Sequence, residues 1–325
     1  MNILLTGGAG YIGSAATRLL LEHGHVVTVL DSLVTGHRGA VPDGAGFVKG
    51  DLADIPALRK LIEEGNFEAV MHFAAFIEAG ESMQKPGKYF RNNLTNSLNL
   101  IEVCVQSGIE RFILSSTASV YASSEEPISE DSAIQPSNVY GQTKLMIEQA
   151  LDWYHRLFGL RYAALRYFNA AGALQDCGEN HKPESHLIPL VLQVPLGLRP
   201  EVHIFGTDYD TPDGTAIRDY VHIADLISAH QLALEKLADT PRLVYNLGNG
   251  SGYSVREVIE TARAVTGHAI PAVEAPRRKG DAPRLVASSE KIRRELGWEP
   301  AFTDLATIIA SAWEWHKAHP QGYGE

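Results

Sequence analysis

The first half of the chain alternates short apolar runs, rich in β-branched residues, with longer segments in which apolar residues recur every three or four positions. The short runs predict β-strands, and the longer segments predict amphipathic helices. Strands that are apolar at nearly every position are typical of a parallel sheet covered by helices on both faces. We therefore expect an α/β fold built on a doubly wound parallel sheet. The predicted strands are 2–7, 25–31, 46–51, 68–74, 111–116 and 162–169.

The pattern changes after about residue 170. Loops rich in Pro, Gly and Asp, at 206–215 and 275–284, now separate the helical segments. A strand-like segment at 244–248 could return to the sheet. We expect residues 1–170 to form the sheet domain, with 217–248 returning to it. Residues 171–216 and 249–325 would then form a smaller C-terminal lobe.

Composition limits the partners that the chain can have. The net charge is −11, and Lys and Arg form no basic stripe, so neither a nucleic acid nor an anionic membrane is expected as a partner. Cys104 and Cys177 predict no disulfide framework, and the scattered histidines, His181 and His186 included, predict no metal site. The first residues, MNILLTGG, are unlike a signal peptide, and no apolar run reaches membrane-spanning length. We expect a cytoplasmic protein.

A glycine-rich stretch, ILLTGGAGYIGS (3–14), lies between the first predicted strand and the first predicted helix. Gly7, Gly10 and Gly13 permit a tight turn and let backbone N–H groups and the helix N-terminus approach a pyrophosphate. Asp31 ends the second predicted strand, where its carboxylate can accept hydrogen bonds from a ribose diol and would repel a 2′-phosphate. The stretch therefore predicts a Rossmann-type site for NAD rather than NADP. The alternative is a glycine-rich turn without a ligand.

Tyr140 and Lys144 lie four residues apart in the first turns of a predicted helix. The pKa of an unperturbed tyrosine, about 10, is too high for a base at neutral pH, and a nearby ammonium group would lower it. The preceding strand ends in LSSTASVY (114–121), which places hydroxyl groups at the carboxyl edge of the sheet, where such folds bind ligands. A hydroxyl, a tyrosine and a lysine there could transfer protons beside a nicotinamide. The alternative is a half-buried tyrosine beside a solvated lysine.

Several longer stretches carry a family resemblance. They are TGGAGYIGS (6–14), HFAA (72–75), GESMQKP (80–86), the helix with Tyr140 and Lys144, LRYFNAAGA (165–173), IFGTDYDTPDGTAIRDYVH (204–222) and HPQGY (319–323). In these the chain resembles the UDP-glucose 4-epimerases of the extended short-chain dehydrogenase/reductase family. The resemblance extends from end to end of the chain, and the DGTAIRDYVH string is far more specific than a dinucleotide fingerprint alone.

The resemblance implies reversible interconversion of UDP-glucose and UDP-galactose. Tyr140, as phenolate, would take the proton of the sugar 4-hydroxyl while the C4 hydride passes to bound NAD. The 4-keto sugar would then turn and receive the hydride on its other face. Lys144 would hold the nicotinamide ribose and tune Tyr140. Thr117 stands where the family usually has a catalytic serine; alternatively, it is only a β-branched residue that ends a strand.

The same resemblance implies two sets of binding residues. For three of these residues there is a simpler alternative role. Asp51 could cap the helix that starts near Ala53, and Arg218 and Arg278 could be ordinary surface charges. The implied cofactor contacts are Gly7, Gly10, Tyr11, Ile12, Gly13, Asp31, Asp51, Leu52, Phe73, Ala74, Ala75, Asn92, Tyr140, Lys144 and Phe168. The implied UDP-sugar contacts, most of them in the C-terminal lobe, are Thr117, Tyr140, Asn169, Leu187, Ile204, Phe205, Arg218, Arg278, Asp281 and Leu285.

Three positions depart from the family pattern. Ile77 stands where many members have a lysine that contacts the cofactor, and His186 replaces a common asparagine. Leu285 stands where some members have a bulky tyrosine that closes the pocket around the sugar 2-position. The smaller side chain predicts some activity on the N-acetylated sugars UDP-GlcNAc and UDP-GalNAc.

Rival functions share the fold and the cofactor. A nucleotide-sugar 4,6-dehydratase usually has Asp-Glu directly after the threonine, and here Ala118 and Ser119 follow Thr117. An epimerase of another nucleotide sugar, such as a UDP-uronic acid, stays open, although the YFNAAGA loop resembles the neutral-sugar branch. A non-catalytic NAD-binding protein would not need the intact Thr117, Tyr140 and Lys144.

Family members are commonly homodimers that pair two long helices of each subunit. The corresponding segments here are 87–107 and 140–158. Their apolar residues could equally face the sheet of their own subunit, so the homodimer follows from the resemblance alone.

Overall fold

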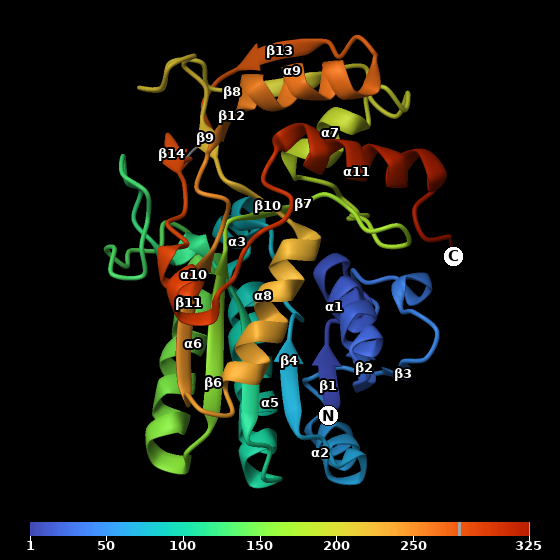
Figure 1. Cartoon of the computed structure of the whole chain (residues 1–325), viewed down its shortest axis with the longest axis vertical. Helices are drawn as coiled ribbons and strands as arrows, with labels where there is room; N and C mark the ends of the chain where they lie inside the picture. Colours follow the sequence, from blue (N-terminus) through green and yellow to red (C-terminus); the bar gives the residue numbers. More distant parts are fainter. Residues whose placement is uncertain (279–280, 325) are drawn as a thin grey trace.

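The computed structural model describes residues 1–278 and 281–324, and its centre is one sheet of seven parallel strands (Figure 1). The strand order is β11-β6-β5-β4-β1-β2-β3, so the connections reverse direction beside β1. In such sheets a ligand binds at the carboxyl ends of the strands beside this reversal. The expected α/β fold with a doubly wound parallel sheet is confirmed. The strands are β1 (Asn2–Thr6), β2 (Val26–Asp31), β3 (Gly46–Lys49), β4 (Ala69–His72), β5 (Arg111–Thr117), β6 (Arg161–Tyr167) and β11 (Arg242–Leu247).

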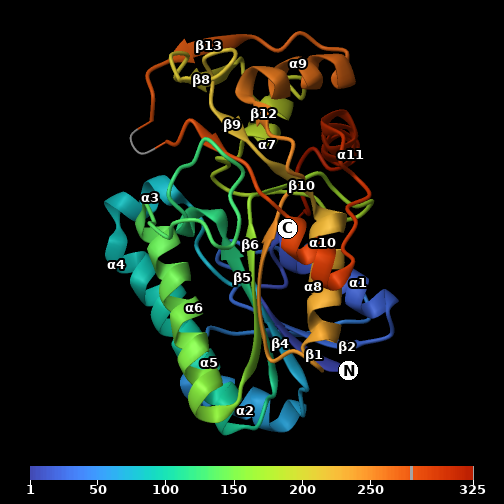
Figure 2. The same cartoon turned by 60° about the vertical axis from the view of Figure 1, so that its left-hand side comes forward.

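Helices cover both faces of the sheet because its strands are apolar on both sides. Ile3 and Leu5 of β1 pack in the apolar cluster of one face, whereas Leu4 packs in that of the other. Figure 2 shows the two layers of helices edge-on. The described residues include no helix with the length and apolar character needed to cross a bilayer. The first face carries α1 (Tyr11–Glu22), α8 (Ile223–Lys236) and α10 (Glu290–Leu296), and the second carries α2 (Ile55–Gly65), α5 (Asn96–Gln106) and α6 (Val139–Phe158).

The long helix expected over 87–107 forms without a break over 86–106, but its middle part is π-helical. Two short helices, α3 (Ala79–Gln84) and α4 (Pro86–Tyr89), lead into a π-helical turn, η2 (Phe90–Thr95), before α5 begins. Within that turn the side chain of Asn93 donates to the Phe76 carbonyl at 2.8 Å and accepts from the Phe76 N–H at 2.9 Å. The turn therefore fixes the loop after β4.

A smaller lobe with its own apolar core lies over the carboxyl ends of the strands (Figure 1). Two short strands, β7 (Asn169–Ala171) and β10 (Tyr220–His222), pair between the sheet and this lobe. The chain leaves the sheet after β6, returns to it through α8 and β11, and then leaves it again. The lobe contains α7 (Leu187–Leu192), β8 (Val202–Phe205), β9 (Ile217–Arg218), β12 (Tyr253–Ser254), α9 (Val255–Thr266), β13 (Ala272–Ala275), β14 (Arg284–Leu285) and α11 (Leu305–Ala318).

Asp219 joins the sheet to the lobe. Its fully buried carboxylate accepts hydrogen bonds from the backbone N–H groups of Asn249 (2.8 Å), Gly250 (2.9 Å) and Ala287 (3.0 Å). Its carbonyl accepts from the backbone and the side chain of Asn169, at 3.0 and 2.8 Å. One residue thus satisfies polar groups from three segments of the chain, which buried polar groups require.

Three buried histidines should make the protein sensitive to acid. Burial lowers the pKa of His72 to about 3 and those of His222 and His230 to about 4. Below a pH of about 6.5 the unfolded chain therefore binds more protons than the folded chain, and each histidine costs about 1.4 kcal/mol of unfolding free energy per pH unit. We expect the free energy of unfolding in urea to fall steadily between pH 6.5 and 5. His230→Gln should reduce the slope of the unfolding free energy against pH by the contribution of one histidine, about 1.4 kcal/mol per pH unit. Equal stability of the unaltered protein at pH 6.5 and pH 5 would contradict the prediction.

Candidate active site

The glycine loop is built so that its backbone can come close to a ligand. Gly7 follows β1 with φ 77°, and a Cβ atom on it would lie 2.5 Å from the backbone nitrogen of Ala74. A Cβ on Gly13 would lie 2.8 Å from the Cα of Gly8 and closer still to the Gly7 carbonyl oxygen. Neither position can carry a side chain without a shift of the backbone. The loop therefore requires the glycines that the sequence places there.

The start of α1 and the end of β2 fit a dinucleotide. Gly10 is the N-cap of α1, and it has no side chain to occupy the first N–H groups of the helix, nor is there an acidic residue in the first turn. The positive end of the helix is thus free for a pyrophosphate. At the end of β2, the two oxygens of the Asp31 carboxylate accept from the N–H groups of Ala9 (2.9 Å) and Leu33 (2.8 Å), and each keeps a lone pair for a ribose hydroxyl. These residues fit NAD.

The other predicted cofactor residues lie around this edge of the sheet. Tyr11 and Ile12 open α1, and the Tyr11 hydroxyl donates to the Gly172 carbonyl at 2.5 Å. Phe73, Ala74 and Ala75 form the loop after β4, while Phe168 follows β6. Asn92 lies in the π-helical turn and donates to the Asn93 side chain at 3.0 Å. The departure Ile77 is half-buried in the loop after β4.

Asp51 is not the helix cap that its alternative role required. It follows β3, and its carboxylate accepts from the Ala53 N–H at 2.9 Å in a short turn. The N-cap of α2 is Asp54, which accepts from the Ala57 N–H at 3.1 Å. Asp51 therefore remains exposed, while its neighbour Leu52 is buried in the core.

The predicted catalytic residues meet where β5 and α6 come together. Asn138 caps α6 by accepting from the Gly141 N–H at 2.8 Å, so Tyr140 and Lys144 occupy its first two turns, as expected. Thr117 is the last residue of β5, and its side chain hydrogen-bonds to the Tyr140 phenol. Lys144 is fully buried and donates from Nζ to the Ser115 carbonyl at 2.7 Å. The structure thus brings all three together at the carboxyl edge of the sheet.

The pKa of Tyr140 shifts in the direction opposite to that expected from Lys144. Burial raises the pKa of Tyr140 to about 12, and the hydrogen bond with Thr117 only partly offsets this. Burial also lowers the pKa of Lys144 to about 8, opposed by the Glu148 carboxylate. The Nζ of Lys144 is directed to the Ser115 carbonyl, and burial dominates the pKa of the phenol.

Gly141, between the two catalytic candidates, sets the distance of α6 from β5. A Cβ atom on it would lie 2.8 Å from the Ser119 carbonyl carbon and closer still to the carbonyl oxygen. Ser119 belongs to the single turn η3 (Ala118–Val120) that follows Thr117. Only glycine lets the helix approach this turn. Sequence reasoning missed this residue, although a glycine inside a predicted helix was a possible signal.

A buried ion pair further along α6 also holds this helix against the sheet. Sequence reasoning missed this pair as well. Glu148, one turn after Lys144, accepts from Arg166 of β6 at 2.6 to 3.2 Å. The same carboxylate accepts from the Ser116 hydroxyl, and Arg166 donates to the Tyr121 hydroxyl at 2.6 Å. Loss of one partner of such a pair costs about 3–5 kcal/mol, because it leaves an uncompensated buried charge.

The predicted UDP-sugar residues line the lobe above this edge. Arg218 donates to the Ala282 carbonyl at 2.9 Å and pairs with Asp281 at 3.2 Å, so these two candidates contact each other. The Arg278 guanidinium lies 4.0 Å above the ring of Phe205. The others lie at element ends: Asn169 begins β7, Leu187 begins α7 after its N-cap His186, Ile204 and Phe205 end β8, and Leu285 ends β14.

Two candidates from distant parts of the chain meet in a small apolar cluster. Phe168 and Leu285 pack against the buried residues Val120 and Tyr121, together with Leu145 of α6. Leu145 directly follows the catalytic candidate Lys144. The position that departs from the family pattern, Leu285, therefore packs against the same cluster as the predicted nicotinamide residue Phe168.

Known proteins are similar to this chain in sequence and fold over nearly its whole length. Residues 3–248 match the model of the NAD dependent epimerase/dehydratase family. The UDP-glucose 4-epimerase of Corynebacterium glutamicum is 50% identical over 319 residues, which cover 98% of this chain and 96% of that protein. A crystal structure of a UDP-glucose 4-epimerase has a TM-score of 0.97 at 50% identity, with 99% of each chain covered. The UDP-glucose 4-epimerase of Bifidobacterium longum, in complex with NAD+ and UDP, has a TM-score of 0.95 at 35% identity and covers 99% of this chain and 100% of its own. The chain therefore belongs to the NAD dependent epimerase/dehydratase family.

Proposed function

We propose that the chain is an NAD-dependent epimerase that interconverts UDP-glucose and UDP-galactose. The observation that carries the proposal is the meeting of Thr117, Tyr140 and Lys144 beside a glycine loop that fits NAD. The full-length similarity to UDP-glucose 4-epimerases supports the same substrate. A dehydratase is disfavoured because Ala118 and Ser119, which follow Thr117, offer no acid–base pair.

In this proposal Tyr140 exchanges the proton of the sugar 4-hydroxyl, and Thr117 hydrogen-bonds to the same oxygen. The Tyr140 phenol, with a pKa of about 12, needs a positive charge close by before it can act as a base at neutral pH. Lys144, one helical turn away, can supply that charge when its ammonium group turns from Ser115 toward a ribose. When bound, NAD supplies the acceptor and donor of the C4 hydride. Arg218 and Arg278 would bind the diphosphate, since guanidinium groups match phosphate oxygens.

A first assay tests the epimerase activity and also shows whether the purified protein retains NAD. The purified protein is given UDP-galactose without added NAD, and UDP-glucose is followed by NMR. Product would support the reaction and a retained cofactor, whereas product only after addition of NAD would mean a loosely held one. No product in either case would overturn the proposal and direct attention to another nucleotide sugar, such as a UDP-uronic acid.

Leu285 should widen the substrate range. Because a leucine stands where a larger aromatic residue would close the pocket around the sugar 2-position, we expect turnover of UDP-GlcNAc as well as of UDP-glucose. Leu285→Tyr should reduce kcat/KM for UDP-GlcNAc by on the order of tenfold or more, with little change for UDP-glucose. Leu285→Val is the matched control and should keep both activities. If the unaltered protein does not turn over UDP-GlcNAc detectably, the prediction is wrong.

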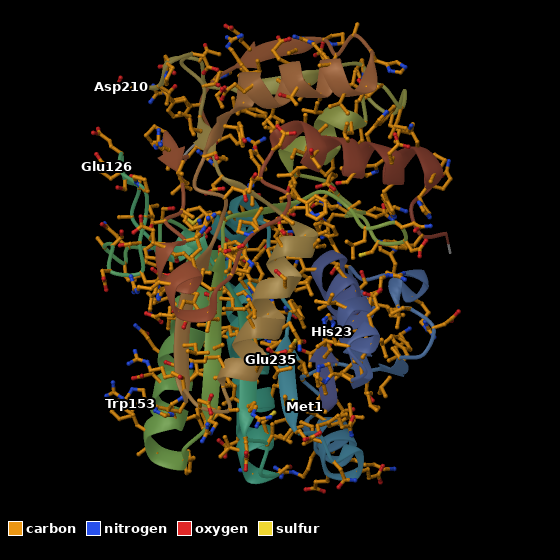
Figure 3. All side chains as sticks on the ribbon, viewed as in Figure 1. Met1, His23, Glu126, Trp153, Asp210 and Glu235 are labelled. Atoms are coloured by element: carbon orange, nitrogen blue, oxygen red, sulfur yellow. The ribbon has the colours of Figure 1, made fainter. Side chains whose placement is uncertain are left out.

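We also propose a homodimer, formed through α5 and α6. While Ile147 and Leu151 of α6 face the core, Trp153, Leu157 and Phe158 are 60%, 66% and 63% exposed near the end of the helix. Figure 3 shows Trp153 on the outer surface. Exposed apolar patches of this kind mark interaction sites. Light scattering should give twice the chain mass, and Trp153→Glu should shift the protein toward the monomer, whereas Leu198→Glu on the lobe should not.

The proposed place of action is the cytoplasm. Cys104 and Cys177 are buried free thiols, as is usual in reducing compartments. The proposed partners are thus a UDP-sugar and a second copy of the chain.

A further inference from the structure

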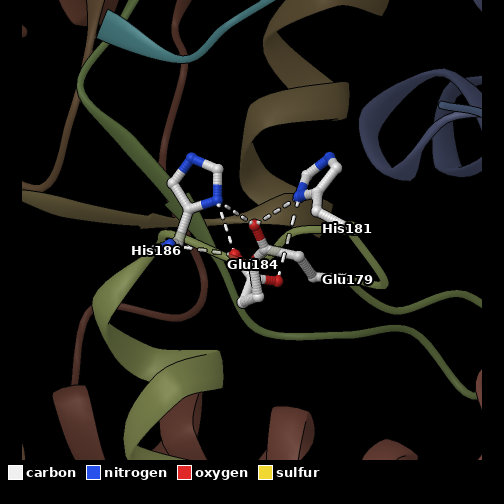
Figure 4. Close-up of side chains that lie close together, drawn as sticks. All are labelled: Glu179, His181, Glu184 and His186. Atoms are coloured by element: carbon white, nitrogen blue, oxygen red, sulfur yellow. Dashed lines mark hydrogen bonds and ion pairs between the residues drawn. The ribbon is translucent and has the colours of Figure 1, made fainter. Parts of the chain in front are cut away.

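Four side chains that the sequence placed in a loop converge on one point. The segment between β7 and α7 carries Glu179, His181, Glu184 and His186, and Figure 4 shows both imidazole rings directed at both carboxylates. One ligand atom from each of the four lies within 4.8 Å of the other three. None of these residues is used in the proposed reaction. Their alternation of carboxylate and imidazole, E-x-H-x-x-E-x-H, was the signal that sequence reasoning passed over.

The distances suit a small metal ion. The Nδ1 atom of His186 lies 2.7 Å from a Glu179 oxygen and 3.1 Å from a Glu184 oxygen. The Nδ1 atom of His181 lies 3.1 and 4.0 Å from oxygens of the same two carboxylates. A tetrahedral zinc ion with bonds of about 2.0–2.1 Å requires its ligand atoms to be about 3.3–3.4 Å apart. These four imidazole–carboxylate separations lie within about 0.7 Å of that spacing, and no two of the four ligand atoms are more than 4.8 Å apart.

Burial of two carboxylates requires compensating positive charge at this point. The side chains of Glu179 and Glu184 are only 7% and 5% exposed, and two buried carboxylates side by side require compensation. Two protonated histidines can supply two positive charges, and so can one divalent ion held by two neutral histidines. The two arrangements have the same net charge and differ in whether a metal is bound. His186, 39% exposed, leaves a path by which an ion can enter.

We propose that Glu179, His181, Glu184 and His186 bind one divalent transition-metal ion, with zinc as the best match. Two imidazole nitrogens and two carboxylate oxygens are ligands that zinc accepts, and four protein ligands close the coordination shell. The carboxylate of Glu184 is already oriented by the backbone N–H groups of Ser185 (2.8 Å) and His186 (2.9 Å). Such hydrogen bonds to a ligand are typical of metal sites.

A closed site of this kind is structural. The loop is held at its other end by the C-terminal segment after α11, where the Tyr323 hydroxyl donates to the Gly178 carbonyl at 2.7 Å. On the far side His186 is the N-cap of α7, directly before the proposed substrate residue Leu187. A bound ion would therefore fix the loop, and with it the start of α7, without touching the reacting atoms.

Metal content and thermal stability test the proposal independently of the reaction. The protein is stripped with a chelator, incubated with Zn2+ and dialysed, and its zinc is measured by mass spectrometry. We expect about one zinc per chain and a higher Tm for the loaded than for the stripped protein, because a ligand that binds only the folded state stabilises it. Loading with Co2+ should give the intense visible absorption of tetrahedral coordination.

Variants identify the ligands. His181→Gln and Glu179→Gln should weaken zinc binding by more than the roughly tenfold to 100-fold that loss of an outer partner costs. His23→Gln, which alters an exposed histidine at the end of α1 (Figure 3), is the matched control and should bind zinc normally. If the unaltered protein retains neither Zn2+ nor Co2+ and its Tm is the same with and without them, the cluster is an ion-pair network and the proposal is wrong. Because these measurements use the unaltered protein, they decide the question even if the variants fail to fold.

Discussion

Replacing Tyr140 with phenylalanine should nearly abolish the conversion of UDP-galactose to UDP-glucose while the protein stays folded. The change removes only the phenol oxygen, which is hydrogen-bonded to Thr117 at the carboxyl edge of the sheet. General acid–base groups contribute about 10²–10⁴-fold to rate, so kcat should fall by at least 100-fold. The measurement is the NMR assay on equal amounts of the two proteins.

Two controls separate catalysis from folding and cofactor binding. Tyr154→Phe alters a tyrosine of the same helix, whose exposed hydroxyl contacts Glu102 of α5, and should leave kcat unchanged. NAD released on denaturation should be the same for Tyr140→Phe as for the unaltered protein. Near-normal activity of Tyr140→Phe would assign the proton transfer to another group.

Gly141→Ala should impair both stability and activity, although helix propensity alone predicts the reverse. Alanine inside a helix is favoured over glycine by about 1 kcal/mol. Here the added methyl group would overlap the Ser119 backbone, and overpacking of a fixed site typically costs about 1–3 kcal/mol. The start of α6 must move away from Thr117, and a displacement of about 1 Å can cost on the order of 100-fold in rate. Urea unfolding and kcat measure the two effects.

Gly80→Ala provides the matched comparison. Gly80 also lies inside a helix, α3, but a Cβ atom on it would meet nothing within 4 Å. This variant should be as stable as the unaltered protein or slightly more stable, with full activity. If Gly141→Ala behaved in the same way, the contact between α6 and the turn after β5 would not set the catalytic geometry.

The sheet could be predicted because each strand is a local signal. All six expected strands form, and the tentative segment 244–248 overlaps the seventh, β11. Parallel strands buried on both faces have nearly continuous apolar sequences. The glycine loop and the helix with Tyr140 could also be predicted from neighbouring residues, because in each case the strand, the loop and the helix follow one another directly in the sequence.

What could not be predicted depends on contacts between distant residues. The partner of Glu148 is Arg166 on another element, and the three N–H groups bound by Asp219 come from loops 30 or more residues away. Asn93, in the π-helical turn, hydrogen-bonds to Phe76 in the loop after β4, a contact that no local pattern predicts. The pKa of Tyr140 was expected to fall because only charge could be inferred from the sequence, whereas burial decides it.

The path of the chain through β11 determines how the molecule can come apart. In the sequence, α8 and β11 lie between the two segments that build the lobe, although α8 packs on the sheet and β11 is one of its strands. Neither the sheet domain nor the lobe therefore corresponds to one continuous stretch of chain. We therefore expect the lobe to close its core only when β11 is docked at the edge of the sheet, and to lose that core when β11 detaches. Heating should therefore melt sheet and lobe in a single cooperative transition, and no cut in the chain would release the lobe as a folded fragment.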